Sequence, residues 1–417
     1  MTTAPATGSP TVPPADDGPW RNPDFRALFG AAALSQFAAN TGYIAVPLLA
    51  LTALDASPAQ VGALAALSTA AFLLIGLPAG AWVDRLRTRR VLITADLARA
   101  GLVASLPLAW WLDVLTLPQL YAVVLLTGCA TVFGEVGSQS ALPQLVGRGG
   151  LVRANAALAT LMAVANIAGR GAGGALIALL TAPVALACAA LGHLGSGLRM
   201  LSVRPVPKPP AAARIPLRAQ ISEGLRHVLG HSELRALALT ASLNNLGGSM
   251  INAMLPVLFV AELGLSAGAL GLFWAAGGAG LLCGARLARP FAARAGYGTA
   301  LTLSLTPAAL LVPMADRGPW LWAAGAGWLV STVTIGSGNV LGVSLRQHLT
   351  PDPLLGRMNA TFRFMLTGAI ALGSAASGLL AELAGLRTTL WAGAALLALS
   401  FVPTLLSPIR GRRSVEG

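Results

Sequence analysis

The chain has 417 residues, of which 55% are apolar and only 10% are charged, and its mean hydropathy is +0.71. A soluble globular domain carries about a quarter charged residues, so this chain could not cover its surface with polar groups in water. The composition therefore excludes a soluble protein and predicts one whose solvent is the lipid bilayer. Since each crossing needs about 20 apolar residues and a loop, the length predicts roughly 12 spans.

The formal net charge is +13, from 28 Lys and Arg against 15 Asp and Glu. In a soluble domain, such a charge would favour nucleic-acid binding. Here the arginines stand in short segments between apolar stretches, without a basic face of interleaved aromatic residues. The charge therefore indicates membrane topology, and we expect no nucleic-acid partner.

The apolar stretches long enough to cross the bilayer fall into two series along the chain. The first series predicts helices over Phe25 to Leu54, Val61 to Val83, Val91 to Leu112, Leu117 to Leu142, Ala156 to Leu180 and Val184 to Val203. The second predicts helices over Leu237 to Leu263, Leu270 to Ala288, Tyr297 to Met314, Trp320 to Leu341, Phe364 to Ala384 and Leu390 to Ser407.

Cations are divided unevenly between the two sets of alternate loops. One set holds most of the 28 cationic residues, whereas the other holds only Arg317 and Arg387. Because cation-rich loops stay in the cytoplasm, both termini are expected there. The sequence thus predicts a multi-pass protein of the bacterial plasma membrane.

The two series of spans predict an all-α integral membrane protein with 12 transmembrane helices in two six-helix bundles, an arrangement typical of transporters with a central path. The expected boundaries are a disordered cytoplasmic tail over 1–22, an N-terminal bundle over 23–203, a cytoplasmic linker with an amphipathic helix over 204–235, a C-terminal bundle over 236–408 and a cytoplasmic tail over 409–417.

The loop between the second and third spans reads Gly80-Ala-Trp-Val-Asp84-Arg85-Leu-Arg87-Thr-Arg89-Arg90. Topology explains its arginines but not Asp84. The segment resembles the signature of the major facilitator superfamily, Gly-x-x-x-Asp-Arg followed by basic residues, with Arg87 where glycine is usual. The resemblance implies that the aspartate contacts the positive dipole end of the eleventh helix and latches the two halves together. The residues it assigns to this latch are Gly80, Asp84, Arg85, Arg89 and Arg90.

Three further segments, 133–143, 223–227 and 347–359, are similar to a branch of that superfamily that includes macrolide-efflux and siderophore-export proteins. The resemblance covers residues 20 to 405. It implies the major facilitator fold and a secondary transporter rather than an enzyme, and it leaves the substrate open.

The fifth predicted helix departs from the superfamily pattern. Its run of Asn166, Gly169, Arg170, Gly171 and Gly174 is similar to a glycine-proline motif of antiporters, but Arg170 takes the place of the proline. The glycines still permit close helix approach. A charge at this depth costs at least about 2.5 to 3.5 kcal/mol, so Arg170 is expected to face a cavity or a partner.

Asp96 and Glu135 are the candidate partners of Arg170, and Arg99 lies three residues after Asp96 on the same face of the third predicted helix. One interpretation is an internal salt-bridge network that neutralises the arginines and holds the N-terminal bundle together. The other is functional: Glu135, with Asp96 as a second candidate, exchanges protons with the cavity, and Arg170 competes for Glu135 or receives an anionic group of the substrate. The sequence leaves both interpretations open.

Neutral polar side chains inside predicted spans mark candidate walls of the central path. Such groups among apolar residues suit an amphiphilic ligand, although interhelical hydrogen bonds are an equally good explanation for each one. Together with Arg170, the cavity candidates are Gln36, Asn40, Tyr43, Asn166, Asn244, Asn245, Asn252 and Asn339.

The sequence points to no cofactor and no metal. His227 and His231 are four residues apart on the predicted linker helix, but no further ligand accompanies them. The three cysteines lack metal or redox spacing. Without a phosphate-binding glycine loop, energy is expected from an ion gradient rather than from ATP.

The leading hypothesis is a monomeric exporter of a small amphiphilic molecule, such as a drug, an antibiotic or a siderophore, that works by alternating access and proton antiport. Its expected partners are the small-molecule substrate, protons and the lipid bilayer. The alternative within transport is an uptake permease for a small nutrient. From a different class, a non-transporting membrane sensor or an embedded transferase stays open.

Overall fold

The computed structural model describes residues 19–83, 86–204, 217–303 and 306–415, and within these ranges it contains helices and no strand. In this part of the chain, 11 helical segments are long and apolar enough to cross a membrane. Helix α5 (Ala182–Met200), which is not among these 11, packs between α1 and α3 and completes the first bundle. The predicted fold class, two six-helix bundles of an integral membrane protein, is therefore confirmed.

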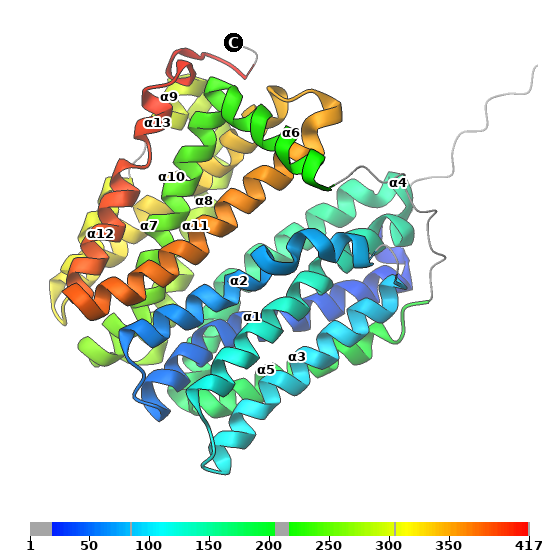
Figure 1. The fold of residues 1–417 in the computed structure, drawn as a ribbon, viewed down its shortest axis with the longest axis vertical. Coiled ribbons are helices and arrows are strands. Elements are labelled where there is room, and N and C mark those ends of the chain that lie inside the picture. The colour runs from blue at the N-terminus through cyan, green and yellow to red at the C-terminus, as the bar shows by residue number, and fades with distance from the viewer. Residues whose placement is uncertain (1–18, 84–85, 205–216, 304–305, 416–417) are drawn as a thin grey trace, which may run out of the picture.

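The first bundle is formed by the N-terminal half of the chain (Figure 1, blue to green). After the 3-10 turn η1 (Pro19–Arg21), it contains α1 (Pro23–Ala53), α2 (Pro58–Val83), α3 (Thr88–Trp111), α4 (Leu117–Leu179) and α5. The 63-residue α4 includes both the fourth and the fifth predicted spans, because the chain continues helically through the expected loop. Gly147, with φ of 66°, breaks the helical backbone between the two spans.

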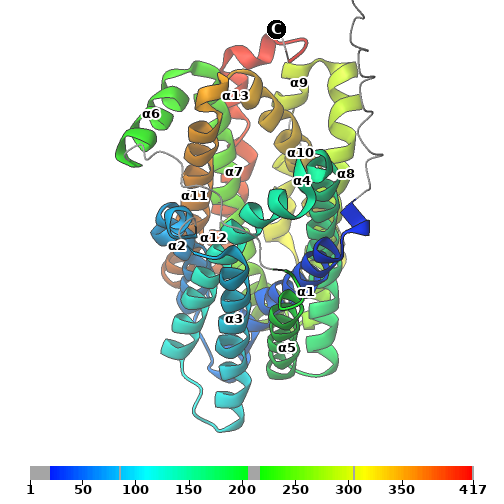
Figure 2. The same ribbon diagram turned by 90° about the vertical axis from the view of Figure 1, so that its right-hand side faces the viewer.

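The second bundle is formed by the C-terminal half of the chain and lies beside the first in both views (Figures 1 and 2). The amphipathic helix α6 (Leu217–Gly230) packs on this bundle against α11. The elements are α7 (Ser232–Pro256), the π-helix η2 (Val257–Glu262), α8 (Ala267–Ala295), α9 (Tyr297–Thr302), the 3-10 helix η3 (Thr306–Met314), α10 (Pro319–His348), the 3-10 turn η4 (Asp352–Leu354), α11 (Leu355–Ala384), α12 (Leu386–Leu399), α13 (Val402–Leu405) and the 3-10 turn η5 (Pro408–Gly411).

Two helices of the second bundle are longer than the hydropathy pattern predicts. We expected helix 10 to end at Leu341 and helix 11 to begin at Phe364, but α10 runs to His348 and α11 begins at Leu355. Hydropathy locates the lipid-facing part of a helix, whereas residues such as Arg, Leu and Met sustain helix beyond it. As a result, Arg346 and Arg363, which we assigned to loops, lie on helices.

The ninth predicted span is irregular. It is divided into α9 and η3, and Pro307 and Pro313 lie in its second part. Proline removes a backbone donor and disfavours the α conformation of the preceding residue, so a continuous α-helix is unfavourable here.

Two close helix crossings join the bundles. A Cβ placed on Gly62 of α2 would lie 2.5 Å from the Cα of Gly378 on α11, and one placed on Gly174 of α4 would lie 2.8 Å from the Cα of Gly271 on α8. Such backbone contact requires glycine on both helices. The expectation that glycines of the fifth span permit close helix approach is thus confirmed at Gly174.

Polar contacts support the α2 and α11 crossing near the start of α2. The hydroxyl of Ser57 donates to Glu382 Oε2 at 3.0 Å, and the backbone N–H of Ala59 lies 3.4 Å from the same oxygen. An apolar cluster that includes Leu48, Leu258 and Trp274 extends from one bundle to the other. We call the end of the molecule defined by these contacts and the two glycine crossings the closed end.

Candidate functional site

A cavity in two lobes lies between the bundles. The amide lobe, of about 600 Å³, is lined mainly by α7, α10 and α11, and the glutamate lobe, of about 510 Å³, mainly by α1 to α4. Tyr43, Ser68, Thr69 and Asn252 line both lobes. Each lobe has the volume of a typical small-molecule pocket.

The amide lobe takes its name from the side chains that we predicted for the central path, Asn244, Asn245, Asn252 and Asn339, all of which line it. Asn244 Oδ1 accepts a hydrogen bond from Ser400 Oγ at 2.8 Å, and Asn252 Oδ1 accepts one from Trp274 Nε1 at 2.8 Å. These amides therefore contribute both to the wall of the cavity and to contacts between helices.

Arg170 lines the amide lobe and is held there by neutral groups. Its Nε donates to Asn40 Oδ1 at 3.3 Å, and its guanidinium lies 4.5 Å from the centre of the Tyr43 ring. Asn40 and Tyr43 are three residues apart and so share one face of α1. The ring of Tyr43 in turn meets Trp274 of α8 edge to face at 5.2 Å. This series of contacts places Arg170 where the two bundles meet.

The glutamate lobe contains an ion pair between the bundles. Arg363 of α11 donates from a terminal nitrogen to Glu135 Oε2 of α4 at 2.5 Å. The guanidinium of Arg363 also lies 4.1 Å from the centre of the Phe72 ring on α2. The side chains of Arg363 and Glu135 are 45% and 41% exposed. Sequence reasoning missed Arg363 because the hydropathy pattern placed it in a loop.

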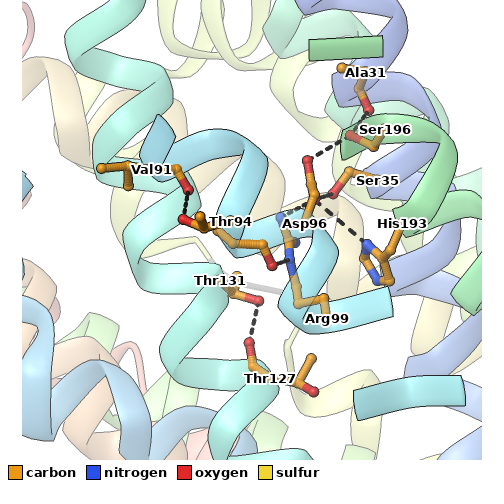
Figure 3. Close-up of polar contacts among 11 residues, drawn as sticks. Ala31, Ser35, Val91, Thr94, Asp96, Arg99, Thr127, Thr131, His193 and Ser196 are labelled. Carbon is orange, nitrogen blue, oxygen red and sulfur yellow. Dashed lines mark hydrogen bonds and ion pairs between the residues drawn. The ribbon is translucent and has the colours of Figure 1, made fainter. Parts of the chain in front are cut away.

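A second acidic group, Asp96, lies in the core of the first bundle (Figure 3). It forms an ion pair with Arg99, three residues later on the same face of α3, and both side chains are buried. Ser196 Oγ lies 2.7 Å from Asp96 Oδ2, and Ser35 Oγ donates to Oδ1 at 3.2 Å. His193 Nδ1 is 3.8 Å from Asp96, at ion-pair distance. Asp96 thus connects α3 to α1 and α5.

The two ion pairs differ in burial, and therefore in how much the loss of one partner destabilises the protein. An exposed pair such as Glu135 and Arg363 contributes on the order of 0 to 1 kcal/mol, so it can break and form again at little cost. Removing one partner of a buried pair such as Asp96 and Arg99 costs about 3 to 5 kcal/mol. The geometry therefore suits Glu135 to a reversible change and Asp96 to a structural role.

The structure does not bring all predicted residues to the cavity. Gln36, Asn40 and Asn166 lie outside the residues that line the two lobes. The backbone oxygen of Gln36 accepts from Asn40 Nδ2 at 2.9 Å, and Asn166 Nδ2 donates to the oxygen of Met162 at 3.0 Å. Arg170 is also outside the expected salt-bridge network, since no carboxylate in the described ranges pairs with it.

The predicted latch is described only in part, because Asp84 and Arg85 lie outside the described residues. Gly80 is in the last turn of α2. Arg89 donates to the backbone oxygen of Leu201 at 2.6 Å, and with Arg90 it lines a surface pocket of about 430 Å³ at the start of α3.

Two segments that carry the family resemblance meet in space. Glu223 of α6 forms an ion pair with Arg357 of α11, and His227 Nε2 lies 3.4 Å from Thr350 Oγ1. These contacts attach α6 to the region between α10 and α11.

Comparisons with known proteins agree with this architecture. Residues 16–416 match the model of the family described as transmembrane secretion effector. The enterobactin exporters EntS of Shigella dysenteriae serotype 1 and of Escherichia coli O1:K1 are 26% identical over 370 residues, which cover 86% of this chain and 85% of theirs. The MFS-type transporter y4rN of Sinorhizobium fredii is 26% identical over 271 residues, 64% of this chain and 66% of its own length.

Solved structures show the same fold. A bacterial homologue of the iron transporter ferroportin, in an inward-facing state, superposes with a TM-score of 0.72 over 92% of this chain and 98% of that one, at 17% identity. The nucleoside transporter NupG superposes with a TM-score of 0.71 over 92% and 98%, at 12% identity. The spans, the cavity between the bundles and the family match together identify a multi-pass membrane transporter, not an enzyme. The chain belongs to the transmembrane secretion effector family of MFS-type transporters.

Proposed function

We propose that this protein is a monomeric exporter of a small amphiphilic molecule, driven by proton antiport. The observation that carries the proposal is the ion pair between Glu135 and Arg363, because it joins the two bundles inside the cavity. Export is further supported by the similarity to the enterobactin exporters, which are related over most of their length.

The contacts between the bundles support a mechanism of alternating access. The closed end contains the glycine crossings of Gly62 with Gly378 and of Gly174 with Gly271. The distribution of loop cations supports an external position for this end, and in this proposal the cavity belongs to a state that receives substrate from the cytoplasm. Export then requires the bundles to separate at the glycine crossings and to approach each other at the opposite end.

Glu135 couples this movement to protons. When it is ionised, Glu135 attracts Arg363 and holds α4 to α11. When it binds a proton, the attraction is lost and Arg363 is released, so the relative positions of the bundles depend on the proton. Because the pair is half-exposed to the cavity, the proton can reach it through water. The ion pair stabilises the contact between the bundles by at most about 1 kcal/mol, so it can break and form again during each transport cycle.

Accumulation of candidate compounds in living cells tests the proposal. Cells with and without the protein are given a panel that includes a macrolide, enterobactin and neutral dyes, before and after a protonophore collapses the proton gradient. We expect the protein to lower the accumulation of at least one compound only while the gradient is present. Equal accumulation across the panel would exclude export, and higher accumulation in cells that carry the protein would favour an uptake permease.

A further inference from the structure

The charges of the cavity do not cancel. Among the residues that line its two lobes in the described part of the chain, the arginines are Arg99, Arg170, Arg346 and Arg363. Arg99 pairs with Asp96, and Arg363 pairs with Glu135. Within residues 19–83, 86–204, 217–303 and 306–415, no carboxylate pairs with Arg170 or Arg346. The positive charge that remains therefore belongs to these two arginines.

Both of these arginines line the amide lobe, which has no acidic residue on its described walls. Arg170 occupies one region of the lobe, one helical turn before the glycine crossing at Gly174. Arg346 lies two residues before the end of α10, with its guanidinium 4.7 Å from the centre of the Phe362 ring. The two cations thus come from different bundles and stand on the same lobe.

Their own contacts leave hydrogen-bonding capacity unused. Arg170 donates to a neutral amide and lies over a neutral ring, and neither contact compensates its charge. The Nε of Arg346 is buried, yet it has no hydrogen-bond partner. A buried donor without a partner is uncommon in folded proteins, so the contacts of Arg346 in this structure leave its guanidinium incompletely satisfied.

We propose that the amide lobe binds the anionic group of the substrate, so that the protein exports amphiphilic organic anions. This inference rests on the proposed exporter function and specifies its substrate class. Arginine suits the role because its planar guanidinium donates two parallel hydrogen bonds to a carboxylate, sulfonate or phosphate. Arg170 and Arg346 stand at separate positions along the lobe and both make it electropositive, and the asparagine amides supply further donors to the charged group.

The apolar part of such a substrate has a place in the same cavity. The glutamate lobe, which shares Tyr43 and Asn252 with the amide lobe, is lined by apolar side chains that include Val61, Leu64 and Val103. An elongated anion with a hydrophobic body therefore finds complementary surroundings for both of its ends.

A matched pair of fluorescent probes tests the proposal. The anion 8-anilinonaphthalene-1-sulfonate and its uncharged counterpart N-phenyl-1-naphthylamine share one aromatic skeleton. Binding of each to the full chain in lipid nanodiscs is measured against nanodiscs without protein. We expect the anion to bind at least about 10-fold more tightly than the neutral probe, and Arg170→Gln and Arg346→Gln each to weaken the anion about 10- to 100-fold with little effect on the neutral probe.

Two control variants separate charge from folding. Arg286 is exposed on α8, outside the residues that line the lobes, so Arg286→Gln should bind both probes like the wild type. Arg170→Lys keeps the cation without the planar fork and should retain part of the preference for the anion. Equal affinity of the wild type for both probes, or an equal loss of both probes in Arg170→Gln, would overturn the proposal.

The accumulation assay distinguishes this inference from the proposed function. If the protein exports only uncharged compounds in a gradient-dependent manner, the substrate class is wrong and the exporter function stands. If it exports compounds of neither kind, the exporter function is wrong, whatever the probes bind.

Discussion

Gly62 of α2 and Gly378 of α11 meet so closely that a Cβ on Gly62 would lie 2.5 Å from the neighbouring Cα. No real side chain tolerates this distance, and the obstacle is backbone rather than a flexible side chain. The crossing therefore exists only while both residues are glycine. The closed state of the transporter, in which the bundles are in contact at the closed end, thus depends on these two residues.

The variant Gly62→Ala should shift the protein away from the closed state. The fraction of protein in which the crossing is formed can be measured as the yield of a disulfide between cysteines introduced at Ser57 and Glu382. These two residues are in hydrogen-bond contact across the crossing. We expect a lower yield in the Gly62→Ala background. Gly101 has no atom within 4 Å of its added Cβ, so Gly101→Ala is the matched control and should leave the yield unchanged. An unchanged yield in Gly62→Ala would show that the crossing does not limit closure.

Asp96 should be required for stability. The variant Asp96→Asn leaves the buried guanidinium of Arg99 without its counter-charge, which we expect to cost about 3 to 5 kcal/mol. Thermal unfolding in detergent should therefore occur at a clearly lower temperature. Adding Arg99→Met should recover much of the loss, because the double variant no longer buries an unpaired charge.

An exposed pair provides the control for this comparison. Arg387 and Glu262 are 36% and 37% exposed, so Glu262→Gln should change stability by at most about 1 kcal/mol. If Asp96→Asn were as mild as Glu262→Gln, the structural role of Asp96 would be wrong, and a role in proton exchange would become the better explanation.

Tyr43 should position Arg170 through its ring rather than through its hydroxyl. The guanidinium lies 4.5 Å from the ring centre, a distance at which a cation and a ring attract by about 0.5 to 1 kcal/mol at a hydrated site. Tyr43→Phe should keep the affinity for 8-anilinonaphthalene-1-sulfonate, and Tyr43→Leu should lower it about 2- to 5-fold. A larger loss in Tyr43→Phe than in Tyr43→Leu would instead assign the effect to the hydroxyl.

The fold was predictable because the bilayer sets a strict requirement on length and hydropathy. Each span must cover about 30 Å of hydrocarbon, and this need leaves a clear pattern in the sequence. The helix ends were less predictable. Arg346 and Arg363 continue their helices into the polar region, where hydropathy gives no signal, and Gly147 breaks α4 at a point that we had expected to be part of a loop.

The site was predictable only where its contacts are local. The spacing of Asp96 and Arg99 places them on one face of a helix, and their pairing was among the alternatives considered from the sequence. Glu135 and Arg363 are 228 residues apart, and their contact depends on how the two bundles dock. A polar residue just beyond an apolar stretch, on the same helical face as the small residues of that stretch, is the signal that could have identified Arg363 as a cavity residue.

Arg363 should matter for coupling rather than for folding. Arg363→Gln leaves Glu135 half-exposed in a hydrated cavity, where an unpaired carboxylate is tolerated. We expect normal amounts of folded protein in the membrane, and loss of the dependence of export on the proton gradient. Loss of folded protein would show that the pair holds the bundles together statically.

Proton movement in inside-out membrane vesicles that enclose a pH-sensitive dye is the direct test of proton coupling at Glu135. The compound added is the one whose cellular accumulation the protein lowers most. We expect transport of this compound by the wild type to change the internal pH, and Glu135→Gln to abolish this change although the protein is present and folded. An undiminished pH change in Glu135→Gln would contradict the assignment of proton coupling to Glu135.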